Sequence, residues 1–291
     1  MFEELNARAA EKNIKVSAIS AGRLPDIQND FDVLSIDYSP YYNFQPPDDL
    51  GFEIKSVIVA ARYSPLVSVS FIIGGKKFNA AIPPTYVDIE ENRSVINDFL
   101  TEEFKDQNYR FVPTHGLPAK PIAVRSGLAK YGRNNVAYFD DFGCFANIYL
   151  FYSDMPCDYG NFYKPETMEC CAGCNLCEKN CPSGAFKNGE NLINGDICLT
   201  MINENGGDFN ENVRPEWHNA LIGCMRCIEK CPPNAEFMNE ARELINFNEE
   251  QTNDFISGTI TEELIKPFGG FMVHCYKNGI LARNLRALAG I

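Results

Sequence analysis

Residues 171–182 read CAGCNLCEKNCP, and residues 224–232 read CMRCIEKCP, a shorter copy that lacks the first cysteine. The first stretch has the spacing C-x2-C-x2-C-x3-C-P, and the second keeps the last three of its cysteines with the proline. Eight of the 12 cysteines lie between positions 171 and 231. This density in one short segment favours metal or redox chemistry over a framework of disulfides.

We call these cysteine runs the first comb (residues 171–182) and the second comb (residues 224–232). Their spacing is typical of iron–sulfur ligation. Bacterial ferredoxins hold [4Fe-4S] clusters with the same run, and in two-cluster ferredoxins the fourth cysteine binds the neighbouring cluster. Cys198 supplies the ligand that the second comb lacks. The sequence therefore predicts two [4Fe-4S] clusters, one held by Cys171, Cys174, Cys177 and Cys231, and the other by Cys198, Cys224, Cys227 and Cys181. Structural zinc is the competing interpretation, because paired C-x2-C units also bind zinc.

The charge balance and the N-terminus limit the partners that we expect. Lys and Arg total 26 against 39 Asp and Glu, a formal net charge of -13. Such a field repels phosphate backbones, so we expect no nucleic-acid partner. The sequence has no signal-peptide pattern and no uncharged apolar stretch near the ~18 residues of a spanning helix. We therefore expect a cytoplasmic protein with no membrane partner.

Hydrophobic periodicity predicts a mixed α+β fold. We expect strands at 14–20, 56–63, 67–73 and 109–115, with a tight hairpin at Gly74 and Gly75, and two further strands around a turn at 140–143. We expect helices at 3–12, 94–106, 121–132, 235–246, 261–267 and 278–289. These elements suggest a core at 1–164, a cluster module at 165–235, and C-terminal helices at 236–291 that pack back on the core.

The stretch LPAKPIAVRSGLAKYGRNN at 117–135 resembles the signature R-x-G-x-x-x-x-G-[KR]-N of the epoxyqueuosine reductase family, cobalamin-dependent relatives of the reductive dehalogenases. The resemblance continues through both combs and closes in GILARNLRALAG at 279–290. It implies a nitroreductase-like α/β core with an inserted ferredoxin-like double-cluster module. It also implies an oxygen-sensitive reductase in which a ferredoxin or flavodoxin feeds electrons through the clusters to a base-off cobalamin. The residues that it places at the cobalamin are Arg125, Gly127, Gly132, Arg133 and Asn134.

Two departures from the family pattern bear on the reaction. The family's proton-donating aspartate falls on Pro113, which cannot donate a proton, so we expect His115 or Tyr131 to serve as the acid. The chain also ends at Ile291, without the helical-repeat segment that the family associates with tRNA. Together with the net charge, this favours a small organic substrate over tRNA. The alternative is an electron-transfer protein without cobalamin that docks a redox partner.

Overall fold

The computed structural model describes residues 2–33, 37, 39–47, 49–186, 192–239 and 241–291. Its larger sheet is antiparallel with the order β1-β2-β8-β5. The strands are β1 (Ile14–Ser20), β2 (Ser56–Tyr63), β8 (Ala146–Ser153) and β5 (Phe111–Thr114). β2 and β8 are almost entirely buried, because helices cover both faces of the sheet.

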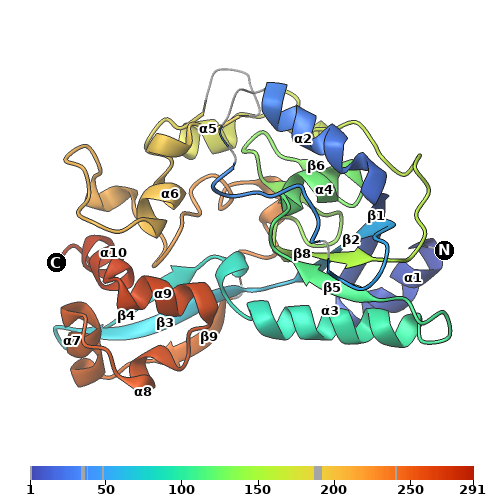
Figure 1. Cartoon of the computed structure of the whole chain (residues 1–291). Coiled ribbons are helices and arrows are strands. Elements are labelled where there is room, and N and C mark those ends of the chain that lie inside the picture. The colour runs from blue at the N-terminus through green and yellow to red at the C-terminus, as the bar shows by residue number, and fades with distance from the viewer. Residues whose placement is uncertain (1, 34–36, 38, 48, 187–191, 240) are drawn as a thin grey trace.

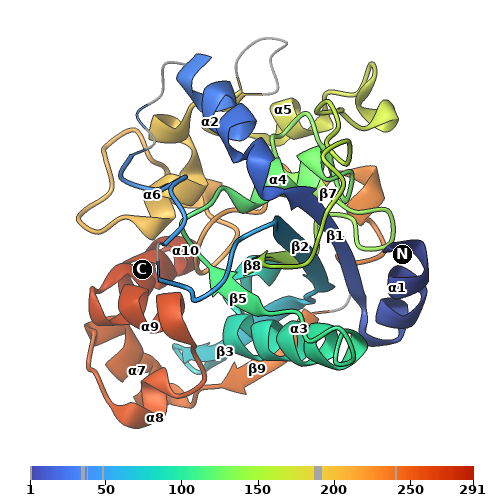
Figure 2. The same cartoon turned by 45° about the vertical axis from the view of Figure 1, so that its right-hand side comes forward.

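Alternate residues of β2 enter two different cores. Ile58 and Ala60 pack with α1 (Phe2–Ala9) and α3 (Ile89–Glu103) on one face. Val57 and Val59 pack with α2 (Leu24–Val33) and α4 (Ala119–Arg125) on the other. Figure 2 shows α2 and α4 above this sheet and α3 below it. The period of two along each strand thus divides this half of the molecule into layers.

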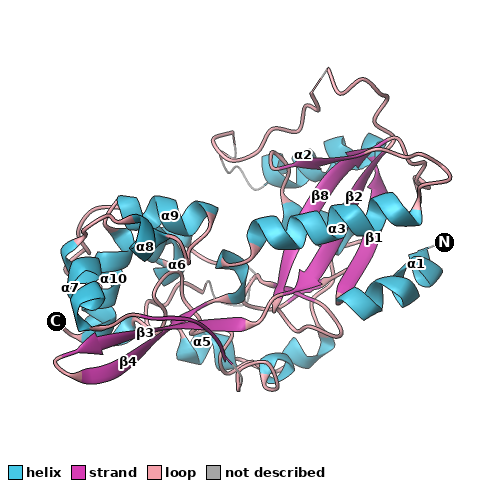
Figure 3. Cartoon of the chain, turned by 90° about the horizontal axis from the view of Figure 1, so that it is seen from below, coloured by secondary structure: helices cyan, strands magenta, loops and turns pink. Residues whose placement is uncertain are grey.

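A smaller sheet has the order β4-β3-β9, formed by β3 (Leu66–Ile73), β4 (Lys76–Ile82) and β9 (Ala241–Asn246). β9 pairs in parallel with β3, although more than 160 residues of chain separate them. The sheet packs against α7 (Glu249–Ser257), α8 (Glu262–Ile265), α9 (Gly270–Lys277) and α10 (Ile280–Ala289). Figure 3 shows this group lying apart from β1, β2 and β8.

The cysteine-rich segment contains only short elements. α5 (Leu176–Asn180) and α6 (Leu199–Glu204) are its longest helices, and 3-10 turns at Glu169–Cys171, Gly195–Ile197, Pro215–Trp217 and Pro232–Asn234 account for most of the rest. Figure 1 shows α6 above α10. Such short elements bury little apolar surface, so order here depends on contacts with the neighbouring sheets and on what the cysteines bind.

Several predicted elements are confirmed. β1 and β2 have the predicted bounds, and β3 begins one residue early, at Leu66. Gly74 and Gly75 both have positive φ, +56° and +74°, which is the conformation of a type I′ hairpin turn. The mixed α and β composition is also confirmed. Among the described residues, no helix combines the length and apolar character needed to cross a bilayer.

The helix predicted at 235–246 is wrong, because residues 241–246 form β9. The segment ARELIN carries no strong periodicity, and only pairing with β3 makes it a strand. The helix predicted at 121–132 ends at Arg125, since Gly127 has φ +75°. Residues Lys130–Tyr131 (β6) instead pair with Ala137–Tyr138 (β7). The turn near 140–143 exists, but β8 pairs with β2 and β5 rather than with β7.

Candidate iron–sulfur centre and adjoining cavities

The first three cysteines of comb one lie near the last cysteine of comb two. The thiol of Cys231 interacts electrostatically with those of Cys171, Cys170 and Cys177. The thiol of Cys174 interacts electrostatically with that of Cys170. A crossed set of ligands requires this arrangement, because Cys231 must leave its own comb to join the other.

The remaining thiols form a second group. Cys224 and Cys227 both interact electrostatically with Cys181 and Cys198, which are distant in sequence. Cys198 directly precedes α6, as its N-terminal flanking residue. The side chain of Asn180 joins the combs, because its amide donates to the Arg226 carbonyl at 2.5 Å. The fold therefore places the eight predicted ligands in two neighbourhoods, which Cys170 and Cys144 also adjoin, and their assignment to individual clusters stays a prediction.

The protonation chemistry of these thiols suits a cationic partner. Burial raises the pKa of Cys224 to about 12 and raises that of Cys227 well above its ordinary value. A backbone N–H of Arg226, 3.4 Å from the Cys224 sulfur, acts in the opposite direction. Thiolates become stable in such a site when metal ions supply positive charge. Within the described residues, no three Cys, His, Asp or Glu side chains converge closely enough to hold a single metal ion.

Arg133, predicted to contact cobalamin, lies against the first comb. Its backbone N–H donates to the Cys171 sulfur at 3.5 Å, and its guanidinium donates to the Cys171 carbonyl at 3.0 Å. The guanidinium also pairs with Glu178 at 3.6 Å. Its buried Nε has no hydrogen-bond partner in the described part of the chain. An unpaired N–H beside a predicted ligand fits a cluster that carries negative sulfur atoms.

Asn134 and Gly132 are also engaged at the cluster side. The Asn134 amide donates to the Tyr138 hydroxyl at 3.0 Å and to the Cys227 carbonyl at 3.2 Å. A Cβ on Gly132 would lie 2.5 Å from the Tyr138 ring and would also collide with Asn134. Gly132 therefore permits this close packing. A role in cobalamin binding stays a prediction for all three residues.

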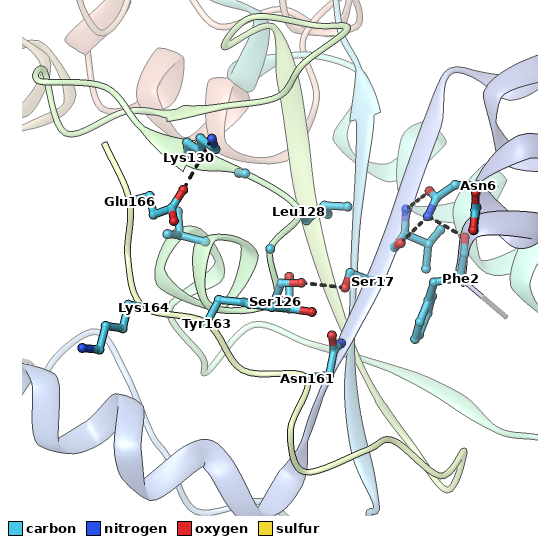
Figure 4. A pocket seen from close by; sticks show the side chains of 15 residues that line it. Phe2, Asn6, Ser17, Ser126, Leu128, Lys130, Asn161, Tyr163, Lys164 and Glu166 are labelled. Atoms are coloured by element: carbon cyan, nitrogen blue, oxygen red, sulfur yellow. Dashed lines mark hydrogen bonds and ion pairs between the residues drawn. The ribbon is translucent and has the colours of Figure 1, made fainter. Parts of the chain in front are cut away.

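Arg125 and Gly127 belong to a different surface. Arg125 forms an ion pair with Asp30 at 2.5 Å and donates to the Tyr163 carbonyl at 3.2 Å. A Cβ on Gly127 would lie 3.1 Å from the Tyr163 ring. Gly127 and Tyr163 line a cavity of about 440 Å³ between β1 and the segment 161–166 (Figure 4). The predicted acids His115 and Tyr131 do not line this cavity.

Tyr131 lines a second cavity, of about 430 Å³, near the start of the cluster segment. Its walls are Phe31, Tyr42, Lys120, Pro121, Tyr131, Asn135, Pro165, Glu166, Thr167 and Leu192. Burial raises the pKa of Tyr131 to about 12, so this phenol stays protonated at neutral pH. The volume is in the range of small-ligand sites, and three aromatic rings offer flat apolar walls.

Lys120 is a functional candidate that sequence reasoning missed. Its ammonium is held by the carbonyl and side-chain oxygens of Asn135, at 2.7 and 2.5 Å. Burial lowers the pKa of Lys120 to about 8. A partly buried lysine with a lowered pKa in a cavity is a frequent sign of a binding or acid–base role. Nothing in the local sequence AKPIA signals that burial.

His115 lies in a third and smaller cavity, of about 180 Å³, together with Pro113 and Arg93. Both His115 and Pro113 are exposed. Pro113 is on β5, an edge strand, where a residue without an N–H is tolerated. The two predicted acids thus line different cavities, and the structure does not bring them together.

Comparison with known proteins agrees with the cluster chemistry. The family model described as a 4Fe-4S double cluster binding domain matches residues 170–234. The epoxyqueuosine reductase of Listeria monocytogenes is 28% identical over 149 residues, which cover 50% of this chain and 38% of that protein. The epoxyqueuosine reductase of Staphylococcus aureus is 25% identical over 136 residues, 46% of this chain and 34% of the relative.

Solved structures extend the likeness to the whole fold. Epoxyqueuosine reductase from Streptococcus thermophilus superposes with a TM-score of 0.67 at 14% identity, over 98% of this chain and 80% of its own. The fold of this chain resembles that of the epoxyqueuosine reductases. A further epoxyqueuosine reductase, solved with an epoxyqueuosine-modified tRNA stem loop, superposes with a TM-score of 0.64 at 17% identity, over 98% of this chain and 80% of that one.

These findings correct two expectations for this epoxyqueuosine reductase-like chain. A small-molecule substrate in place of tRNA was wrong, because the matched relatives are epoxyqueuosine reductases and one neighbour holds a modified tRNA stem loop. The absence of a nucleic-acid partner was wrong for the same reason. Net charge describes the mean field of a protein, whereas nucleic acid responds to the local field where it docks. The curated relatives are matched over little more than a third of their length.

Proposed function

We propose that this chain is an iron–sulfur oxidoreductase that uses two [4Fe-4S] clusters to reduce epoxyqueuosine in tRNA. The observation that carries the proposal is the double-cluster segment 170–234, in which distant cysteines gather in two groups inside an epoxyqueuosine reductase-like fold. Reduction of an epoxide to an alkene consumes two electrons and two protons and releases the oxygen as water. The chain must therefore provide an electron path and a proton source beside one substrate site.

The eight cysteines of the two groups would hold the clusters, which supply single electrons at low potential. Arg133 and the Arg226 backbone would then donate to sulfur around them, from 3.5 and 3.4 Å. The neighbouring segment 165–167 borders the Tyr131 cavity, and Met168 donates to the Tyr131 carbonyl at 2.9 Å. Because the chain just before the cluster segment contacts Tyr131 directly, we propose that the Tyr131 cavity forms part of the site where electrons are transferred to the substrate.

Cobalamin is the third redox group that we propose, on the family resemblance, and it would supply a strongly reducing cobalt. The polar groups of Arg125 and Asn134, and the Arg133 guanidinium apart from its Nε, are engaged by protein atoms, so a corrin-binding role for these residues stays a prediction. No step is therefore assigned to them. The nitroreductase-like character of the core, the three-part division of the chain and a cytoplasmic location likewise stay predictions.

For the proton we propose the Tyr131 cavity over that of His115. Tyr131 remains protonated because burial raises its pKa to about 12, and burial lowers the pKa of the neighbouring Lys120 to about 8, so that its ammonium releases a proton more readily. Both groups line one cavity near the start of the cluster segment, whereas His115 is exposed at a smaller one. The Tyr131 side chain would donate the proton, and Lys120 would orient the substrate or restore the proton.

Anaerobic reconstitution followed by a turnover assay tests the proposal. We expect about eight irons per chain from the ligand count, uptake of cobalamin in its base-off form, and conversion of epoxyqueuosine to queuosine in tRNA. Iron near zero with stoichiometric zinc would disprove the clusters. Full clusters with no turnover of the modified tRNA would leave an electron-transfer protein and reject the reductase.

Two matched variants separate the candidate acids. Tyr131→Phe is expected to slow the single-turnover rate by roughly 10² or more, the usual contribution of a positioned acid. His115→Phe should keep the single-turnover rate within about twofold of wild type, well short of the roughly 10²-fold loss expected when a true acid is removed. The opposite pattern, with a slow His115 variant and a normal Tyr131 variant, would identify His115 as the proton donor.

A further inference from the structure

The turn between β6 and β7, residues 132–136, reaches from the core to both combs. Arg133 donates to the Cys171 sulfur, and Asn134 donates to the Cys227 carbonyl. Tyr138, the last residue of β7, is only 3% exposed and packs in one hydrophobic cluster with Cys144, Cys227 and Cys231, with its hydroxyl beside the Cys231 thiol. Cys171 and Cys231 are two of the four residues that the crossed ligand set assigns to the same cluster. This hairpin therefore touches one cluster through two ligands from different combs.

Among the described residues, the Tyr138 hydroxyl accepts one hydrogen bond, which leaves its proton available to the neighbouring sulfur atoms. The Asn134 amide donates to the phenol oxygen at 3.0 Å, so the oxygen already accepts and its proton is available. Two sulfurs lie within its reach, those of Cys231 and Cys144. The Cys144 sulfur already accepts from the Asn234 amide at 3.2 Å. A cluster-bound thiolate is the stronger acceptor of the two, since charge-assisted hydrogen bonds are about twice as strong as neutral ones.

We propose that Tyr138, oriented by Asn134, donates a hydrogen bond to the Cys231 ligand and raises the reduction potential of the cluster that Cys231 holds. Reduction adds negative charge to the cluster and its sulfurs, so a donor stabilises the reduced state more than the oxidised one. Tyr138 is a positioning residue and does not meet the substrate. The inference rests on the proposed clusters and not on the proposed substrate.

Gly132 and Asn134 both favour this position of the Tyr138 hydroxyl. Gly132 lets the ring approach the backbone of the turn, because any Cβ there would collide with it. Asn134 is 4% exposed and connects the phenol to the second comb through Cys227. A phenol that only filled space would need neither its hydroxyl nor a buried amide behind it.

Potentiometric titration of the reconstituted protein, followed by electron paramagnetic resonance, is the test. Tyr138→Phe removes only the hydroxyl, and we expect the reduction equilibrium of one cluster to fall roughly tenfold, about 59 mV for one electron. The other cluster should not change. Tyr149→Phe is the matched control, because that hydroxyl is bonded to the Ile89 carbonyl at 2.9 Å, on the α3 side of the larger sheet. Ser183→Ala removes a hydroxyl 3.5 Å from the Cys181 sulfur and should shift the other cluster instead.

The outcomes separate this inference from the proposed function. Unchanged potentials in a Tyr138→Phe protein with full iron content would overturn the inference and leave the clusters intact. Absence of iron from the wild-type protein would overturn both. If Tyr138→Phe does not load clusters, 3-fluorotyrosine incorporated throughout the wild-type chain replaces it. Fluorination strengthens the phenol as a donor, so one potential should rise, and two unmoved potentials would reject the contact.

Discussion

Lys120 illustrates, at the scale of one residue, how burial converts an ordinary side chain into a functional candidate. Its ammonium is held by Asn135, whose backbone is left-handed with φ +59°. Two neutral oxygens offset only part of the cost of removing a charge from water. Proteins keep such a costly group mainly where it serves a site, so stability and function should oppose each other at this position.

Lys120→Met keeps the length of the side chain and removes the charge. Burial lowers the pKa from 10.5 to about 8, so the folded chain binds fewer protons than the unfolded chain between those values, and its stability rises with pH there. Below pH 8 the folded state bears the full cost of the ammonium. We expect the variant to gain about 1–3 kcal/mol at pH 7, after the lost hydrogen bonds are deducted, and to lose this advantage as the pH rises through that window.

Urea midpoints of wild type and Lys120→Met at pH 7 and pH 10 measure the effect. Lys130→Met is the control, because Lys130 is about half exposed and its pair with Glu166 spans 3.4 Å. A variant less stable than wild type at pH 7 would show that the Asn135 hydrogen bonds outweigh the burial cost.

At the scale of elements, α10 organises the surroundings of the second comb. Asn284, fully buried, donates to the carbonyls of Asn203 in α6 and of Leu221, at 2.8 and 3.0 Å. Asn203 in turn donates to the carbonyl of Gly223, next to Cys224, at 2.7 Å. The R-N pair in GILARNLRALAG thus supports the positions of Cys198 and Cys224, a role that its sequence alone does not reveal.

Asn284→Ala leaves two buried carbonyls without this donor, and we expect a loss of about 2–4 kcal/mol in the free energy of unfolding. Iron analysis should show that the second cluster is lost before the first. Asn278→Ala is the matched control, because that exposed amide bonds to the carbonyl and ring of His274 within the last turn of α9. Equal iron retention in the two variants would argue against a supporting role for α10.

At the scale of the whole molecule, the β3–β4 hairpin packs against helices that follow the cluster segment in the chain. Phe71 of β3 is fully buried, with its ring centroid 5.5 Å from that of Phe247 and 5.0 Å from that of Phe255. These partners lie beyond the cluster segment, so one core is assembled from residues on both sides of it. The two flanks of the cysteine-rich segment should therefore fold together.

Phe71→Ala should cost about 3–5 kcal/mol, as a large-to-small change in a core. Because the lost contacts are with Phe247 and Phe255, hydrogen exchange should accelerate in α7 through α10 as well as in β3. Phe78→Ala on the facing strand, where the ring is partly exposed, should show a smaller effect. Faster exchange confined to the hairpin would indicate that the two flanks fold separately.

Local chemistry determined what could be predicted without the structure. The comb spacing fixes how many thiolates can surround one metal body, and Gly74-Gly75 specifies its own turn, because in both cases the interacting groups are close in sequence. Net charge is a sum over the whole chain, and it misled about nucleic acid. The strand at Ala241–Asn246 was missed because its partner β3 lies far away in the chain.

Tertiary structure decided which thiols come together and which neighbours the turn at residues 132–136 contacts. The Cys231 and Cys181 thiols lie near those of the opposite comb, where Asn180 and the turn around Gly132 bring the combs together through hydrogen bonds to Arg226 and Cys227. The same packing turns Arg133 and Tyr138 toward the cysteines and leaves Tyr131 and Lys120 in a cavity beside them. Comb spacing predicts the ligands because the covalent chain fixes that spacing, whereas which thiols come together depends on long-range contacts that form only when the two sheets and the cluster segment pack together.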